Sequence, residues 1–167
     1  MLFRSAEVRE LLTRMRELAA ILRERRRRKG LLELSMPAPE LDYDDKHRVV
    51  GAHYSPDDES HRMIEEFMVT ANEAVARTLA DADVDFLRRI HEIPDPRKLK
   101  AFAEFTGSMG IKIEDYRSRF ELQQVLRKVA GQPTAHAVNY ALLRSLKEAV
   151  YSPDDEGHFA LASDCYC

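Results

Sequence analysis

The segment SHRMIEEFMVTANEAVA, residues 60–76, sets two adjacent carboxylates, Glu65 and Glu66, among apolar residues that recur at helical spacing. Carboxylates at the margin of a buried helix face are either paired with a cation or used to bind a ligand. Glu65 and Asn72 lie on the flank of the apolar stripe, and His61 lies one turn before Glu65. These groups can accept hydrogen bonds from the hydroxyl groups of a ligand. The alternative for Glu65 is a buried salt bridge or a capping contact.

The other charged residues of this segment are explained by an exposed helix surface. A helical wheel at about 100° per residue places the apolar side chains on one face, which we expect to pack against the core. They are Ile64, Phe67, Met68, Ala71, Val75 and Leu79. Glu66 and Glu73 lie opposite, each four residues from an arginine, Arg62 or Arg77. Because pairs at this spacing stabilise an exposed helix by about 0.2–0.5 kcal/mol, we expect Glu66 to be a solvated surface residue.

The N-terminal residues predict an amphipathic helix that ends in a basic run. From Ser5, apolar residues recur at steps of three and four, at Val8, Leu11, Met15, Leu18 and Leu22. The run RERRRRKG, residues 23–30, ends at Gly30, which can adopt the left-handed capping conformation. Two interpretations of this run stay open. Its cations are a solvated helix end that complements the helix dipole, or they contact the phosphates of a nucleic acid.

The rest of the chain alternates short strand patterns with helical segments. Alternating apolar and polar residues predict strands at 32–36 and 41–43, and a polar turn after 41–43 predicts a hairpin with 48–53. Further strands are predicted over 84–91 and from His158 onward. Helices are predicted from Pro96, with Asp95 as N-cap, towards Gly110, after a Ser118–Glu121 capping box, and over 135–150. We therefore predict one helix-rich α+β domain with a small mixed or antiparallel sheet.

Composition agrees with one domain over residues 1–167. The 26 Lys and Arg against 29 Asp and Glu give a net charge of −3, so charge alone does not indicate a nucleic-acid-binding protein. No stretch approaches the roughly 18 apolar residues that a membrane span needs, and we expect no membrane partner. Cys165 and Cys167 form no disulfide framework, which favours a reducing, cytoplasmic location.

Three ordered stretches carry a family resemblance: the 60–76 segment, RRIHEIPDPRKLKAF (88–102) and LLRSLKEAVYSPDDEGHFALASDCYC (142–167). Together they resemble the RNB catalytic domain of the ribonuclease II and ribonuclease R family. The match corresponds to the middle and later portion of that domain. The family's upstream aspartate cluster and its downstream SPIRRY motif are absent, and Asp42, Asp44 and Asp45 do not match the metal-binding pattern.

The resemblance implies a magnesium-dependent exoribonuclease that hydrolyses single-stranded RNA from the 3′ end to mononucleotides. It implies that Glu65 faces the terminal ribose, and we expect Asn72, Arg88, Arg89 and Lys98 also to contact RNA. We expect no catalytic residue and no metal ligand within this chain, which would be inactive in isolation. The alternative is a non-catalytic helical interaction module or RNA-binding module, with self-association through exposed apolar surface.

Overall fold

A computed structural model describes residues 5–36, 39–54 and 58–167 of the chain. Within these ranges the elements follow the order α1 (Ala6–Arg28), β1 (Pro39–Tyr43), β2 (Val49–Tyr54), α2 (Glu59–Asp81), β3 (Arg88–Ile90), α3 (Pro96–Ser108), α4 (Arg119–Val129), α5 (Ala135–Ser145) and β4 (Val150–Ser152). The helix-rich α+β class predicted from the sequence is confirmed. Both two-stranded sheets, β1–β2 and β3–β4, are antiparallel.

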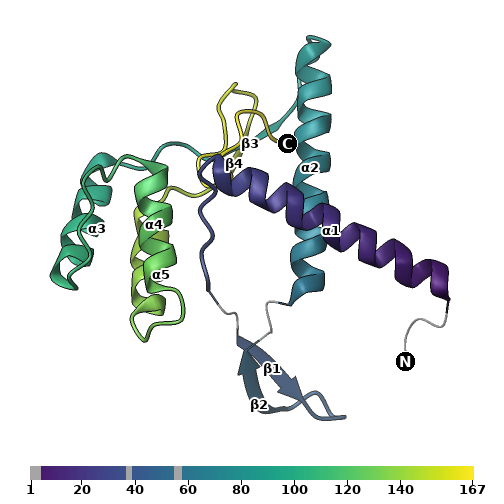
Figure 1. Ribbon diagram of the computed structural model, residues 1–167, viewed down its shortest axis with the longest axis horizontal. Helices are drawn as coiled ribbons and strands as arrows, with labels where there is room; N and C mark the ends of the chain where they lie inside the picture. Colours follow the sequence, from purple (N-terminus) through teal and green to yellow (C-terminus); the bar gives the residue numbers. More distant parts are fainter. Residues whose placement is uncertain (1–4, 37–38, 55–57) are drawn as a thin grey trace.

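The elements form two groups that meet at β3 and β4 (Figure 1). On one side the long helices α1 and α2 cross, and on the other α3, α4 and α5 pack together. The predicted hairpin is formed by β1 and β2, and it projects away from both groups. The C-terminal segment ends beside α2, so residues distant in sequence meet at the junction.

The hydrophobic core lies between α3, α4 and α5. Its fully buried side chains include Leu99 on α3, Leu122 on α4 and Leu142 on α5. Leu32, from the segment that follows α1, joins the same core. Burial of a leucine or valine side chain contributes about 1.5–3 kcal/mol, so these contacts are the main stabilisation of the three-helix group.

Local signals set where several helices begin and end. Asp95 accepts a hydrogen bond from the Arg97 main-chain nitrogen at 2.8 Å, and Pro96 is the first residue of α3, as predicted. Gly30 follows α1 with a φ of 92°, the left-handed conformation predicted for it. Ser118 is the N-cap residue of α4, but its side chain makes no capping hydrogen bond, so the predicted capping box is not formed.

The end of α1 is held by α4. The Gln123 side-chain nitrogen donates to the main-chain oxygens of Arg27 and Leu31, both at 3.0 Å. The Arg27 oxygen also accepts from the Gly30 main-chain nitrogen at 3.1 Å, whereas the Leu31 oxygen lies just beyond the helix end. Gln123 therefore fixes the direction in which the chain leaves α1 towards the core.

Three strand predictions and one helix boundary are wrong. Residues 32–36 form no strand, because they bond to loop and side-chain groups instead, including the Ala160 oxygen and the Asn139 side chain. The strand predicted over 84–91 is limited to β3. The segment from His158 makes isolated bridges only. The partner of β3 is β4, which lies where the last helix was predicted to end.

Among the described residues, no helix combines the length and the apolar composition that a membrane span requires.

Candidate functional site at the junction of α2 and the C-terminal segment

The buried face of α2 differs from the face that the wheel predicts. Ile64, Met68 and Val75 are more than half exposed, at 57%, 52% and 52%. Glu66, Val69 and Ala76 are the buried residues of this helix instead. The physical reason is that α2 packs against α1 and the C-terminal segment, and these partners select the buried face whatever the intrinsic amphipathicity of the helix.

Glu66 is therefore a buried residue and is paired with a cation from α1. The Arg26 Nη1 atom donates to Glu66 Oε1 at 2.8 Å, and the two side chains are 7% and 4% exposed. Both residues were expected at the solvated surface, Glu66 beside Arg62 and Arg26 within the basic run. A buried carboxylate needs such a partner, and this pair joins α1 to α2 where the two helices cross.

Glu65, which precedes Glu66 in the chain, is exposed and lies beside the Arg26–Glu66 pair. Its side chain is 55% exposed, and Oε1 is 3.9 Å from Arg26 Nη1. Glu65, Glu66 and Arg62 line one wall of a cavity of about 340 Å³, whose other wall is the extended segment 31–35. This volume is at the lower end of the range of small-molecule sites, about 300–1,000 Å³. The cavity thus offers an accessible carboxylate beside arginine side chains.

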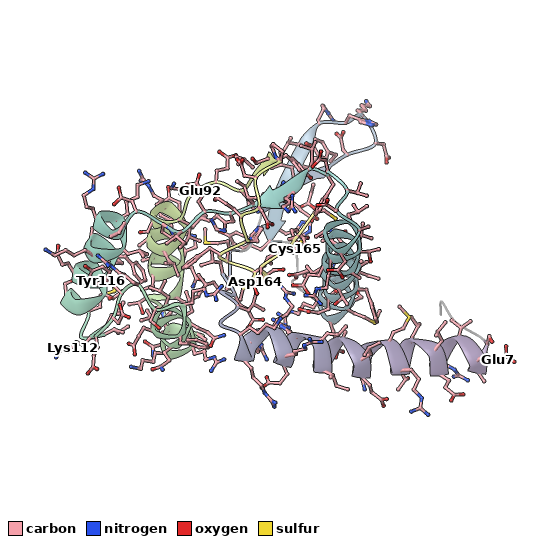
Figure 2. The ribbon with its side chains drawn as sticks, turned by 90° about the horizontal axis from the view of Figure 1, so that it is seen from above. Glu7, Glu92, Lys112, Tyr116, Asp164 and Cys165 are labelled. Atoms are coloured by element: carbon pink, nitrogen blue, oxygen red, sulfur yellow. The ribbon has the colours of Figure 1, made fainter. Side chains whose placement is uncertain are left out.

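Asn72 links α2 to the C-terminal segment. Its side-chain nitrogen donates to the Tyr166 hydroxyl at 3.1 Å, and its main-chain oxygen accepts from Cys167 Sγ at 3.3 Å. Figure 2 shows the neighbouring Asp164 and Cys165 between α2 and the three-helix group. Asn72 and Glu65 lie on the same helix but face different partners. The Asn72 side chain bonds to the C-terminal segment, whereas Glu65 lines the cavity beside segment 31–35.

Two buried histidines, His158 and His91, lie between Tyr166 of the C-terminal segment and β3. The His158 ring lies edge-on to the Tyr166 ring at 5.6 Å and to the His91 ring at 4.9 Å between centroids. Burial, together with the nearby His91 and Arg89, lowers the pKa of His158 to about 4. Burial also lowers the pKa of His91. Both rings are consequently neutral near pH 7 and act as packed, hydrogen-bonded groups.

Arg88 and Arg89 lie on β3, beside the histidines. The Arg88 Nη1 atom donates to the Pro153 oxygen at 3.2 Å, and its Nε atom lies 3.1 Å from the exposed Asp155 carboxylate. The Arg89 guanidinium lies over the Tyr151 ring at 5.3 Å from the centroid. Both guanidinium groups thus stabilise the β3–β4 sheet through contacts within the chain.

Lys98 lies apart from the other predicted RNA contacts. It is an exposed residue on α3, and Figure 1 places α3 at the opposite end of the molecule from α2. The structure therefore brings Glu65 and Asn72 together on one helix and Arg88 and Arg89 on the adjoining strand. It does not bring Lys98 to this junction.

The basic run at the end of α1 is divided between internal and exposed roles. The Nε atoms of Arg23 and Arg27 donate to the two oxygens of Glu33, at 2.5 and 2.8 Å. Burial raises the pKa of Glu33, but the hydrogen bonds from Arg27 and Arg23 outweigh burial and lower it. With Arg26 buried as well, half of the six arginines and lysines between residues 23 and 29 serve the fold.

Sequence reasoning missed Arg26, Glu66, His158 and Tyr166. The spacing of Glu66, Val69 and Ala76 at three and seven residues is the signal that could have identified the second, mixed face of α2. Within the described ranges, no group of three or more His, Cys, Asp and Glu side chains could hold a metal ion. The residues in these ranges thus do not fit the magnesium ion that the resemblance implies.

Comparisons with known proteins agree with this geometry. The RNB domain family matches residues 3–167. Ribonuclease R of Thermotoga maritima is 37% identical over 158 residues, which are 90% of this chain and 22% of that protein. Ribonuclease R of Aquifex aeolicus is 32% identical, over 94% of this chain and 23% of its own length. The chain thus spans about a fifth of the curated relatives it matches.

A solved structure gives the same result in three dimensions. Mycoplasma genitalium RNase R in complex with ribose-methylated single-stranded RNA superimposes with a TM-score of 0.92 at 26% identity, over 99% of this chain and 27% of that one. Its complex with double-stranded RNA superimposes with a TM-score of 0.86. The arrangement of α2, the C-terminal segment and the three-helix group is therefore shared with an RNA-bound nuclease, and the chain belongs to the RNB domain family.

Proposed function

We propose that this chain is the RNA-binding part of an exoribonuclease that degrades single-stranded RNA from the 3′ end to mononucleotides. The observation that carries the proposal is the structural match, over 99% of the chain, to an RNase R bound to single-stranded RNA. In this proposal the cavity between α2 and segment 31–35, which Glu65 lines, binds the terminal nucleotide. The carboxylates that hold magnesium in such an enzyme are expected outside residues 1–167.

Glu65 has the chemistry for the terminal ribose. Its exposed carboxylate is an acceptor and can receive hydrogen bonds from the 2′-OH and 3′-OH groups, of which the 2′-OH distinguishes RNA from DNA. Arg23 and Arg62 line the same cavity and supply positive charge near a phosphate. Asn72 contributes by holding Tyr166, and Arg88 and Arg89 lie on the adjoining strand, where they can approach the RNA backbone.

Binding of short labelled oligonucleotides, measured by fluorescence anisotropy, tests this proposal. One single-stranded RNA is compared with the same sequence ending in a 2′-deoxynucleotide. A hydrogen bond to a charged group contributes about 1.5–3 kcal/mol, so we expect the all-ribose RNA to bind at least about tenfold more tightly. Glu65→Gln should remove this preference, whereas Glu73→Gln, about two turns away on the same helix, should retain it. We expect no release of mononucleotides by the chain alone with magnesium.

Two results would contradict the proposal. One is equal affinity of the wild-type chain for the two oligonucleotides, and the other is an unchanged preference in the Glu65→Gln variant. Affinity for both should fall with added salt, because contacts to phosphates release counterions.

The second candidate function is a helical interaction module. Exposed apolar residues on α1 and α2 favour it, including Leu11, Ile21, Ile64 and Met68. A defined oligomer by light scattering, together with no measurable affinity for RNA in the same binding experiment, would support this candidate over the first.

A further inference from the structure

The buried pair of Arg26 and Glu66 is incompletely satisfied. Besides the 2.8 Å contact between them, the Arg26 Nε and Nη2 atoms and the Glu66 Oε2 atom are buried, with no hydrogen-bond partner among the described residues. Leaving buried polar atoms unpaired has an energetic cost. Moreover, well-packed apolar residues in place of a buried ion pair are often neutral or stabilising. Stability of the α1–α2 crossing is therefore a weak explanation for this pair.

A second contact of Arg26 suggests what else the pair does. The same Nη1 atom that bonds to Glu66 lies 3.9 Å from Glu65 Oε1. Arg26 thus faces two adjacent carboxylates, one buried and one exposed to the cavity beside segment 31–35. A guanidinium group is planar, permanently charged and rigid, so it can hold a fixed position between two partners.

The difference in exposure separates the roles of the two carboxylates. Glu66 is enclosed and anchors Arg26, whereas the Glu65 side chain is 55% exposed and lines the cavity, so packing alone does not fix its rotamer. A positive charge fixed on one side of Glu65 favours the rotamers that keep the carboxylate near it. The position of Arg26 is fixed in turn by the helix end, where Gln123 holds the carbonyls of Arg27 and Leu31.

We propose that Arg26 is a positioning residue, anchored by Glu66, that orients the Glu65 carboxylate towards the terminal ribose and so sets the preference for ribose over deoxyribose. The inference rests on the proposed function, since it assigns Glu65 to that ribose. It makes α1 a part of the nucleotide site through one buried side chain. The exposed cations of the basic run have no share in this role.

The pair can be removed without leaving an unpaired buried charge. In the double variant Arg26→Met with Glu66→Met, both charges are replaced by flexible apolar side chains of similar length, so folding should be retained. The matched control is Lys100→Met with Glu104→Met on α3, an exposed pair at 3.8 Å that is distant from α2. Urea unfolding of each variant establishes that it is folded before binding is measured.

The readout is the ratio of dissociation constants for the all-ribose oligonucleotide and its 3′-terminal deoxy form. We expect the Arg26–Glu66 double variant to lose most of the about tenfold preference, and the Lys100–Glu104 control to keep it. Arg26→Lys keeps the buried charge but lacks the forked guanidinium, so it should fold and show a preference reduced to about threefold.

The outcomes separate the two proposals. If Glu65→Gln abolishes the ribose preference while the folded double variant or the folded Arg26→Lys variant keeps the wild-type ratio, the positioning role of Arg26 is wrong and the role of Glu65 stands. If Glu65→Gln keeps the wild-type ratio, the role of Glu65 is wrong and the role of Arg26 falls with it. Loss of the ratio in all three variants supports both.

Discussion

Acid should destabilise this protein through His158 and His91, whose neutral rings join the C-terminal segment to β3. The Nδ1 atom of His158 accepts from the Leu161 main-chain nitrogen, and that of His91 accepts from Ala160, both at 3.3 Å. The His91 Nε2 atom lies 2.8 Å from the Lys147 oxygen and must therefore carry the ring proton. A second proton on either ring would eliminate its acceptor and place a charge in a buried cluster.

The size of the effect follows from the pKa values. Burial, with the charges of His91 and Arg89, lowers the pKa of His158 from the ordinary 6.5 to about 4. As the pH falls below 6.5, the unfolded chain takes up the proton first, so stability is fully present above 6.5 and is lost towards pH 4. At about pH 5 the loss from His158 alone is about 2 kcal/mol. The lowered pKa of His91 acts in the same direction.

Urea unfolding at about pH 7.5 and about pH 5, followed by circular dichroism, measures this loss. His158→Gln should be less stable than wild type near neutral pH but should lose less stability on acidification. His136→Gln, an exposed histidine on α5, is the matched control and should show the wild-type pH dependence. The Asp95 carboxylate does not contribute to this difference, because hydrogen bonds from Arg97 lower its pKa to about 2 and its stabilisation is lost as the pH falls below 3.8. Glu33, whose pKa is lowered from 4.5, adds the same small loss in the wild-type chain and in both variants.

Equal unfolding free energies of the wild-type chain at the two pH values would refute the reasoning. A His158→Gln variant that loses as much unfolding free energy as the wild type between the two pH values would also refute it. In that case the buried proton acceptor of His158 would not be the cause of the loss.

The core and the end of α1 give two further tests by urea unfolding. Leu142 is fully buried, so Leu142→Ala should cost about 2–5 kcal/mol, whereas Leu143→Ala, at a side chain that is 44% exposed, should change stability by less than about 0.5 kcal/mol. A comparable loss in both variants would contradict the described core. Gln123→Ala should cost about 1–3 kcal/mol, because the buried Leu31 carbonyl loses a donor and the Arg27 carbonyl keeps only its bond from the Gly30 main-chain nitrogen. Gln124→Ala, at its exposed neighbour, should be nearly neutral.

Elements with a local cause were predictable from the sequence. The start of α3 depends on Asp95 and Pro96, which act within a few residues, and both were identified. The β1–β2 hairpin likewise follows from alternation on either side of an acidic turn, where Asp44 accepts hydrogen bonds from the main-chain nitrogens of Lys46 and Arg48. These signals need no knowledge of the tertiary structure.

Elements with a distant cause were not predictable. The pairing of β3 with β4 joins segments about sixty residues apart, and residues 32–36 take their hydrogen bonds from the 139 and 160 regions instead of from a strand. The helix α5 ends at Ser145, not near Val150, because Val150–Ser152 pair with β3 as the strand β4. In each case a tertiary partner overrides a local preference.

In the candidate site, the two adjacent residues Glu65 and Glu66 also differ in how far local sequence determines their environment. The flank position of Glu65 on the wheel left both an exposed and a buried side chain open, and the structure places it 55% exposed. The burial of Glu66 depends on Arg26, forty residues earlier. A wheel ranks Glu66 as a surface residue because it cannot include that partner. The protein accepts a buried charge here and leaves Ile64, on the apolar face, 57% exposed. Consistent local and global preferences are the rule in folded proteins, and departures concentrate at functional positions. The reversed face of α2 is therefore consistent with the proposed binding role of the Glu65–Glu66 turn, which the Glu65→Gln and Arg26–Glu66 variants test.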